Sequence, residues 1–76
     1  MKKNPFKMHR VISSNLALAG YDKENQKMRV SFHTGKTYEY DNVPEEVYKG
    51  IFTSDSPGLY FRKTVVDSKR FKSKKL

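Results

Sequence analysis

Hydrophobic and polar residues alternate along three short stretches in the first half of the chain. The alternation is clearest from Lys27 to Phe32, where every second residue is hydrophobic. A period of two is typical of a strand with one buried face. Weaker alternation runs through residues 14–22 and again through residues 36–40. Polar residues and a glycine-containing turn, residues 33–35, separate these stretches. The pattern predicts three antiparallel strands joined as a meander.

The hydrophobic period changes after residue 42. Val43, Val47 and Ile51 recur at four-residue spacing, which is typical of the buried stripe of a helix. Pro44 suits the first turn of a helix, because the missing N–H of proline has no partner to lose there. We therefore expect a helix of about ten residues that buries this stripe.

A second short helix is predicted near residue 57. Residues 54–58 break the first helical pattern, and within them a serine is followed by proline, a typical helix start. The new helix would bury Phe61 and Val65. Beyond Ser68, Phe71 is the one residue that we expect to anchor the chain, so the remainder is predicted to fray.

These elements predict an α+β fold, a three-stranded antiparallel meander followed by two short helices that cover one face of the sheet. A small SH3-like barrel with a helical C-terminus is the alternative, because short meanders can curl and close. In either case we expect a basic N-terminal arm at residues 1–7, a globular domain at residues 8–67 and a basic C-terminal tail at residues 68–76.

Size and composition narrow the class of protein. The chain has 76 residues and no cysteine, so one small core must hold it together without disulfides. No hydrophobic run approaches the ~20 residues of a membrane span, and the N-terminus lacks the apolar stretch of a signal peptide. We expect a soluble, cytoplasmic protein that is monomeric.

The net charge of +8 is concentrated at the two ends. Residues 1–10 carry four basic side chains and no acidic one, and residues 62–76 carry seven basic side chains and one acidic one. Residues 11–61 carry five basic and seven acidic side chains, so the middle of the chain is mildly acidic. Basic ends can bind phosphate backbones or acidic protein surfaces, and they can also serve only to keep a protein soluble.

Three segments carry a family resemblance. They are Ser-Ser-Asn-Leu-Ala-Leu-Ala-Gly-Tyr-Asp at residues 13–22, Tyr-Glu-Tyr at residues 38–40 and Pro-Gly-Leu-Tyr-Phe at residues 57–61. Together they resemble the KTSC domain, a module at the C-terminus of some lysyl-tRNA synthetases that also occurs alone, and the match runs from about residue 8 to residue 71. The resemblance implies RNA binding, the activity suggested for this family. The family tends to place asparagine where this chain has Arg62.

The tyrosine pair admits two interpretations. Spacing of two places Tyr38 and Tyr40 on one face of a strand, where the rings could stack unpaired bases. The same spacing would direct both rings into the core, and we favour the core for at least one of them. Residues 13–15 also admit two interpretations, because their side chains could bind phosphate oxygens or form hydrogen bonds within a local turn. We favour the turn.

The leading functional hypothesis is a nucleic-acid-binding accessory module, with RNA favoured as the partner and with low sequence specificity. Its candidate interface consists of the tyrosine pair and the basic residues of the C-terminal end: Tyr38, Tyr40, Arg62, Lys63, Lys69, Arg70, Lys72, Lys74 and Lys75.

The alternative is a protein-interaction or inhibitor module of phage or bacterial type, which binds an acidic protein through the same charges. We expect no enzyme activity, because no catalytic motif or convergent set of titratable residues is visible. His9 and His33 are isolated, so neither a metal site nor a cofactor is predicted.

Overall fold

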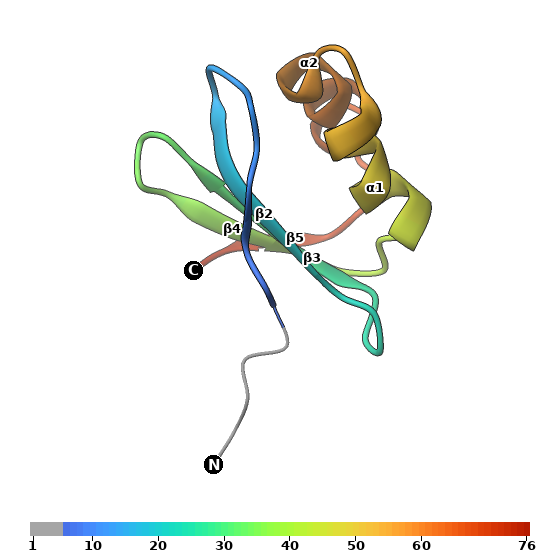
Figure 1. The fold of residues 1–76 in the computed structure, drawn as a ribbon. Helices are drawn as coiled ribbons and strands as arrows, with labels where there is room; N and C mark the ends of the chain where they lie inside the picture. Colours follow the sequence, from blue (N-terminus) through green and yellow to red (C-terminus); the bar gives the residue numbers. More distant parts are fainter. Residues whose placement is uncertain (1–5) are drawn as a thin grey trace.

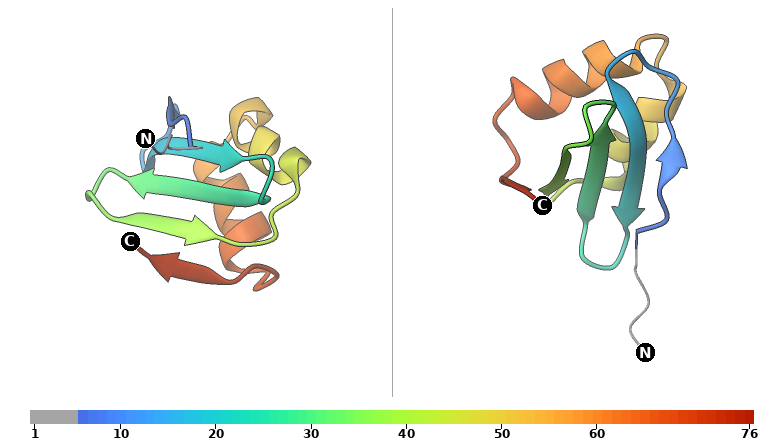
Figure 2. Two further views of the ribbon diagram at one scale, coloured as in Figure 1. Left: turned by 90° about the horizontal axis from the view of Figure 1, so that it is seen from below. Right: turned by 90° about the vertical axis from the view of Figure 1, so that its left-hand side faces the viewer.

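The central feature of the fold is an open antiparallel sheet with helices on one of its faces. The computed structural model describes residues 6–76. The strands are β1 (His9–Arg10), β2 (Leu16–Asp22), β3 (Lys27–Phe32), β4 (Thr37–Tyr40) and β5 (Ser73–Lys75), and they lie side by side in that order. The helices are α1 (Glu45–Thr53) and α2 (Pro57–Phe61), and α2 continues as a single π-helical segment, η1 (Arg62–Val66). Figures 1 and 2 show the helices on one side of the sheet.

The predicted meander is confirmed. The three central strands pair antiparallel, with Val30 of β3 opposite Ala19 of β2 on one side and opposite Tyr38 of β4 on the other. Met28 and Val30 are fully buried, as their alternation indicates. A bulge between Leu16 and Leu18 shifts the register of β2, and this irregularity accounts for the weaker alternation there.

The sheet contains two edge strands that the sequence pattern did not indicate. The prediction that the chain frays after Ser68 is wrong, because β5 pairs with β4 along the sheet edge. The backbone N–H of Asp41 donates to the carbonyl of Lys72, and that of Leu76 donates to the carbonyl of Thr37, each at 2.9 Å. Backbone hydrogen bonds do not depend on hydrophobic side chains, so an exposed strand can form without any alternation. The sheet does not close, so the barrel alternative is not adopted.

Both helices form close to where the spacing of hydrophobic residues predicts them. Pro44 precedes α1 as its N-cap residue, and Ile51 of α1 is fully buried. Ser56 is the N-cap residue of α2, and Phe61 is buried at the end of that helix. The core lies between the helices and the inner face of the sheet and is formed by Val11, Leu16, Ala19, Met28, Val30, Tyr40, Val43, Ile51, Phe61 and Val65.

A close contact between the two helices fixes how they pack. The hydroxyl of Tyr60 in α2 donates to the carbonyl of Val47 in α1 at 2.9 Å. The Tyr60 ring therefore lies directly over Gly50, and a Cβ atom at residue 50 would collide with the Tyr60 ring and hydroxyl. Glycine within a helix usually lowers stability, so its presence here reflects this packing requirement.

Substitution Gly50→Ala should lower stability although alanine is the better helix former. We expect a loss of ~1–2 kcal/mol in the free energy of unfolding, because the rigid Tyr60 ring must move. In a Tyr60→Ala background the same substitution should raise stability by up to ~1 kcal/mol, since only helix propensity then counts. Urea denaturation of the four proteins checks the sign change, and an equal effect of Gly50→Ala in both backgrounds would contradict the contact.

Candidate nucleic-acid interface

Two adjoining cavities form a groove between the sheet and the C-terminal helical segment. The first has a volume of about 330 Å³ and is lined by residues from segments 14–16, 32–36 and 58–66. The second, of about 500 Å³, lies beside β4 and is lined by residues that include Tyr38, Lys69 and Phe71. Phe32 and Val66 line both cavities, so we treat the two as one aromatic groove.

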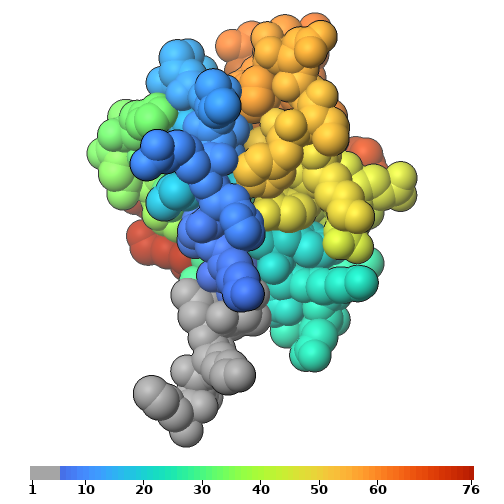
Figure 3. All heavy atoms as spheres, viewed as in Figure 1, coloured from blue at the N-terminus to red at the C-terminus, as the bar shows by residue number. Residues whose placement is uncertain are grey.

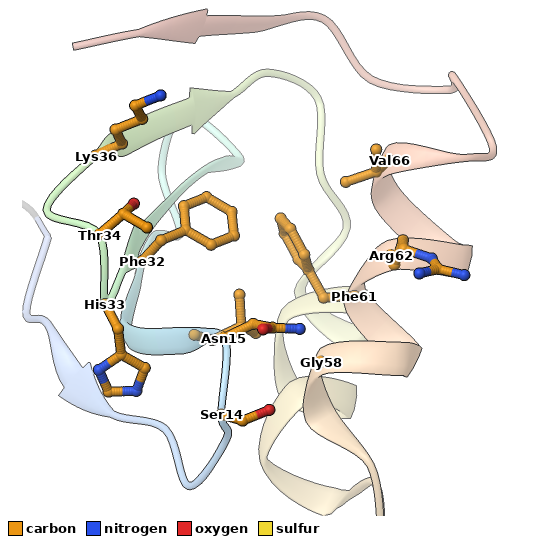
Figure 4. Close-up of a pocket in the computed structure, with 11 residues that line it drawn as sticks. Ser14, Asn15, Phe32, His33, Thr34, Lys36, Gly58, Phe61, Arg62 and Val66 are labelled. Atoms are coloured by element: carbon orange, nitrogen blue, oxygen red, sulfur yellow. The ribbon is translucent and has the colours of Figure 1, made fainter.

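Aromatic rings form the floor of the aromatic groove. The ring centroids of Phe32 and Phe61 are 5.8 Å apart, and Phe32 and Tyr38 are separated by the same distance with nearly perpendicular planes. Figure 4 shows the Phe32 and Phe61 rings approaching each other between the β3–β4 hairpin and the helix. Such edge-to-face contacts favour a single ring arrangement. The floor is therefore a fixed surface of ring edges and faces.

The structure separates the two members of the tyrosine pair. Tyr40 is 6% exposed and packs against Phe61 with ring planes 80° apart, so its ring belongs to the core. Burial raises the pKa of Tyr40 to about 12, with a smaller contribution from nearby Tyr38. Tyr38 is half-buried at the groove. The prediction that at least one ring lies in the core is therefore confirmed for Tyr40, which borders the second cavity, and Tyr38 is the more accessible ring.

Basic side chains stand at the rim of the groove. Lys36 and Arg62 line the first cavity, and Lys69 lines the second. Figure 4 shows Lys36 on the hairpin side and Arg62 on the helix, with its guanidinium group turned outward from the rings. The Arg62 guanidinium lies 3.8 Å from the carboxylate of Asp67, and both side chains are exposed. Among residues 6–76, no carboxylate lies within ion-pair distance of Lys36 or Lys69.

The other predicted basic residues are exposed and do not line the two cavities. Lys63, Arg70 and Lys72 are exposed outside the cavities. Lys75 lies opposite Tyr38 in the pairing of β5 with β4, whereas Lys74 lies opposite Glu39. Because cross-strand partners point to the same face, Lys75 belongs to the groove side and Lys74 to the outer face of the sheet.

The outer face contains a cluster of charges around Glu39. Its carboxylate lies 2.9 Å from the guanidinium of Arg29, 3.7 Å from the ammonium of Lys27 and 3.8 Å from that of Lys74. Glu39 is only 4% exposed, so the three cations cover it. One cation of the predicted C-terminal interface, Lys74, is thus partly neutralised within the domain.

Part of the predicted N-terminal arm is anchored on the same face. Phe6 is buried, and the Arg29 guanidinium carbon lies 4.2 Å from the centre of its ring. Lys7 is exposed. The remainder of the arm, with Lys2 and Lys3, lies outside the described residues.

Two of the sequence segments noted above meet at the first cavity. The Ser13 hydroxyl accepts hydrogen bonds from the backbone N–H groups of Asn15 and Leu16, so the favoured turn role is confirmed for Ser13. A Cβ atom at Gly58 would lie 3.2 Å from the Ser13 hydroxyl and 3.5 Å from the Asn15 side-chain nitrogen. Sequence reasoning missed this juxtaposition, although the glycine between Pro57 and Leu59 was a signal that something approaches closely there.

Neither a metal centre nor a membrane-crossing helix is found in residues 6–76. No group of three or more histidine, cysteine, aspartate and glutamate side chains there could hold a metal ion. None of the helices in this part of the chain is both long enough and apolar enough to cross a bilayer.

Comparison with known proteins places the chain in a family. The family model of the KTSC domain matches residues 12–69, and this span includes the three central strands, both helices and the lining of the first cavity. The chain belongs to the KTSC domain family. The fold of this KTSC domain is similar to the crystal structure of a KTSC domain protein from Yersinia pestis, with a TM-score of 0.79 and 29% identity over 93% of this chain and 97% of that one.

Two further relatives are known by sequence. An uncharacterized protein of Stutzerimonas stutzeri is 43% identical over 49 residues, which cover 64% of this KTSC domain chain and 69% of the relative. A protein of Tsukamurella paurometabola is 38% identical over 53 residues, which cover 70% of this chain and 79% of that protein. The names of these two relatives assign no activity.

Ionisation of Tyr40 should destabilise the domain at high pH. The pKa is raised from its ordinary value of 10.0 to about 12 in the folded state, so between these values the unfolded chain loses a proton that the folded chain keeps. Stability should therefore be full below pH 10 and fall as pH rises toward 12, by an amount on the order of 2 kcal/mol. In Tyr40→Phe this decline should be shallower when urea denaturation is followed across the same pH range. Parallel declines in the two proteins would contradict the assignment.

Substitution Glu39→Gln should destabilise the domain, because Arg29, Lys27 and Lys74 then face one another without the buried carboxylate. We expect a loss of ~1–3 kcal/mol in the free energy of unfolding, partly recovered by added salt. Asp41→Asn is the control, since its side chain is 44% exposed and within residues 6–76 its one ion pair is with Lys27, and it should cost less than ~0.5 kcal/mol. Thermal denaturation at low and high salt measures both effects, and equal losses would show that burial of Glu39 is unimportant.

Proposed function

We propose that this KTSC domain is a non-enzymatic module that binds single-stranded nucleic acid, RNA in preference, along the aromatic groove. The observation that carries the proposal is the combination of an aromatic floor with a basic rim in one groove. Proteins that bind single strands combine aromatic side chains, on which bases stack, with a positively charged groove that follows the backbone. The preference for RNA rests on the family resemblance.

The exposed rings favour a single strand over a duplex. Phe32, Tyr38 and Phe71 are all partly buried residues at the edge of the core, and each contributes to the groove. A base can reach such a ring only when it is unstacked, as in loops and single strands. Tyr40 borders the second cavity but offers little surface for stacking, because it is only 6% exposed.

Basic side chains along the same groove support it as the path of the nucleic-acid backbone. Lys36, Arg62 and Lys69 stand at its rim, and Lys75 lies on the same side of the sheet. Asp67, beside Arg62, is exposed and does not line either cavity. When the logarithm of the binding constant is plotted against the logarithm of the salt concentration, the slope should be about −0.7 for each phosphate neutralised on a single strand.

The double substitution Arg62→Gln with Lys69→Gln tests this assignment against general charge attraction. We expect roughly tenfold weaker binding of labelled single-stranded RNA and a shallower salt dependence, because two phosphate contacts are lost. The matched control is Lys23→Gln with Lys49→Gln, which changes the net charge equally away from the groove and should leave affinity within about twofold. Fluorescence anisotropy at two salt concentrations, with duplex DNA and heparin as competitors, measures both.

Two outcomes would contradict the proposal. Equal weakening in both double variants would show that binding is generic attraction to a polyanion. Absence of RNA binding by the unaltered protein at low salt would exclude the function altogether.

A specific observation also favours a protein partner as the second candidate function. Ile12 is 89% exposed and lies near two other exposed hydrophobic side chains, Phe52 and Leu59. A cavity of about 300 Å³ separates the segment of Ile12 from α1, and Figure 3 shows this blue segment beside the yellow and orange helices. Clusters of exposed hydrophobic residues commonly mark protein-binding surfaces. This candidate would be favoured if the unaltered protein does not bind RNA and a pulldown with it returns one acidic protein in stoichiometric amount.

A further inference from the structure

The first cavity of the aromatic groove brings together three kinds of recognition group. Phe32 provides ring surface with the buried Phe61 behind it, Asn15 provides an amide, and Lys36 and Arg62 provide positive charge. None of the residues that line this cavity is acidic. Its volume, about 330 Å³, falls at the lower end of the range for small-molecule sites, ~300–1,000 Å³. The cavity therefore suits a small anionic ligand that contains a flat ring.

Asn15 is held at the mouth of the cavity by its backbone. Its N–H donates to the Ser13 hydroxyl at 3.1 Å, and its carbonyl accepts from the backbone N–H of His33 at 3.1 Å. The His33 ring in turn lies 2.9 Å from the Ser13 carbonyl, so the turn before β2 is tied to the β3–β4 hairpin. These backbone hydrogen bonds hold Asn15 in place and do not involve its side chain.

The side-chain amide of Asn15 is available to a ligand. Within the described part of the chain, no residue forms a hydrogen bond with this amide. Gly58 lies beside it, because a Cβ atom at that position would be in ordinary van der Waals contact with its nitrogen, at 3.5 Å. An amide offers one acceptor and two donor hydrogens in one plane, which complements the hydrogen-bonding edge of a nucleobase.

We infer that the first cavity binds one nucleotide of the strand, with its base against Phe32 and hydrogen-bonded to Asn15 and its phosphate beside Lys36. Arg62, whose guanidinium is turned outward, contacts the next phosphate at the rim. This inference rests on the proposed function and goes further, since it places base recognition at one position. The sequence indicated no such set of residues, because Asn15, Phe32 and Gly58 are distant along the chain.

Titration of the full chain with adenosine, cytidine, guanosine and uridine 5′-monophosphates, followed by NMR of backbone amides, tests the site directly. Shifts should centre on residues 14–16, 32–36 and 58–62. Ribose 5-phosphate should bind about tenfold more weakly than the best nucleotide, because it lacks the ring that stacks. Asn15→Ala should weaken the best nucleotide about tenfold and leave ribose 5-phosphate unchanged. Lys36→Gln should weaken the binding of both ligands, and Lys49→Gln should change the binding of neither.

Each result decides the inference separately from the proposed function. The nucleotide site would be overturned if nucleotides shift only the amide signals of lysines outside the first cavity. It would also be overturned if ribose 5-phosphate and every nucleotide bind equally well, even if RNA oligomers bind. Shifts at the cavity that depend on Asn15 would support it, even if oligomers bind no more tightly than mononucleotides and the strand path is wrong. If neither nucleotides nor oligomers bind at low salt, both proposals fail.

Discussion

The contact of the Phe61 ring with Phe32 and Tyr40 holds the helical segment against the sheet. Phe61 is 2% exposed, and its centroid lies 5.8 Å from that of Phe32 and 5.6 Å from that of Tyr40. These two partners belong to neighbouring strands, so one side chain joins α2 to both β3 and β4. The two cavities adjoin at Phe32. The aromatic groove is therefore the accessible margin of the contact that stabilises the fold.

The backbone around this contact departs from a regular helix. Directly after Phe61 the chain forms the π-helical segment η1, closed by a hydrogen bond of 2.7 Å from the N–H of Asp67 to the carbonyl of Arg62. A π-helical segment turns side chains away from the positions that an α-helix would give them, and such segments are frequent at functional sites. Here Val65 remains in the core and borders the second cavity, while Arg62 and Val66 line the first. The irregular segment thus serves both the core and the proposed interface.

The parts of the fold that the sequence predicts are those decided by hydrophobic spacing. Alternation identified β3 with its observed bounds, Lys27–Phe32, and the four-residue spacing of Val47 and Ile51 identified α1. The strand β5 could not be found in this way, because its three residues are all exposed and its pairing depends on backbone groups alone. The order of elements was therefore predictable, and the edges of the sheet were not.

The candidate site was predictable to a smaller degree. The charge of the C-terminal segment indicated Arg62 and Lys69, and the structure places both at the groove. The spacing of Tyr38 and Tyr40 indicated a shared face but could not indicate that Phe61 covers Tyr40, since that contact joins residues far apart in the chain. Lys36 was missed for the same reason, and Asn15 was considered only as a phosphate contact or a turn residue. Their role depends on which loops the fold brings to the mouth of one cavity.

An ordered C-terminal segment alters how the basic end of the chain can act. A frayed tail would lose conformational entropy on binding, whereas residues already paired in β5 are preorganised and lose less. The alternating faces of β5 also divide the lysines, with Lys74 beside Glu39 and Lys75 on the groove side. Removal of the segment would therefore disturb the sheet edge and the charge together. Substitutions that neutralise single side chains separate the two effects, because they leave the backbone pairing of β4 with β5 in place.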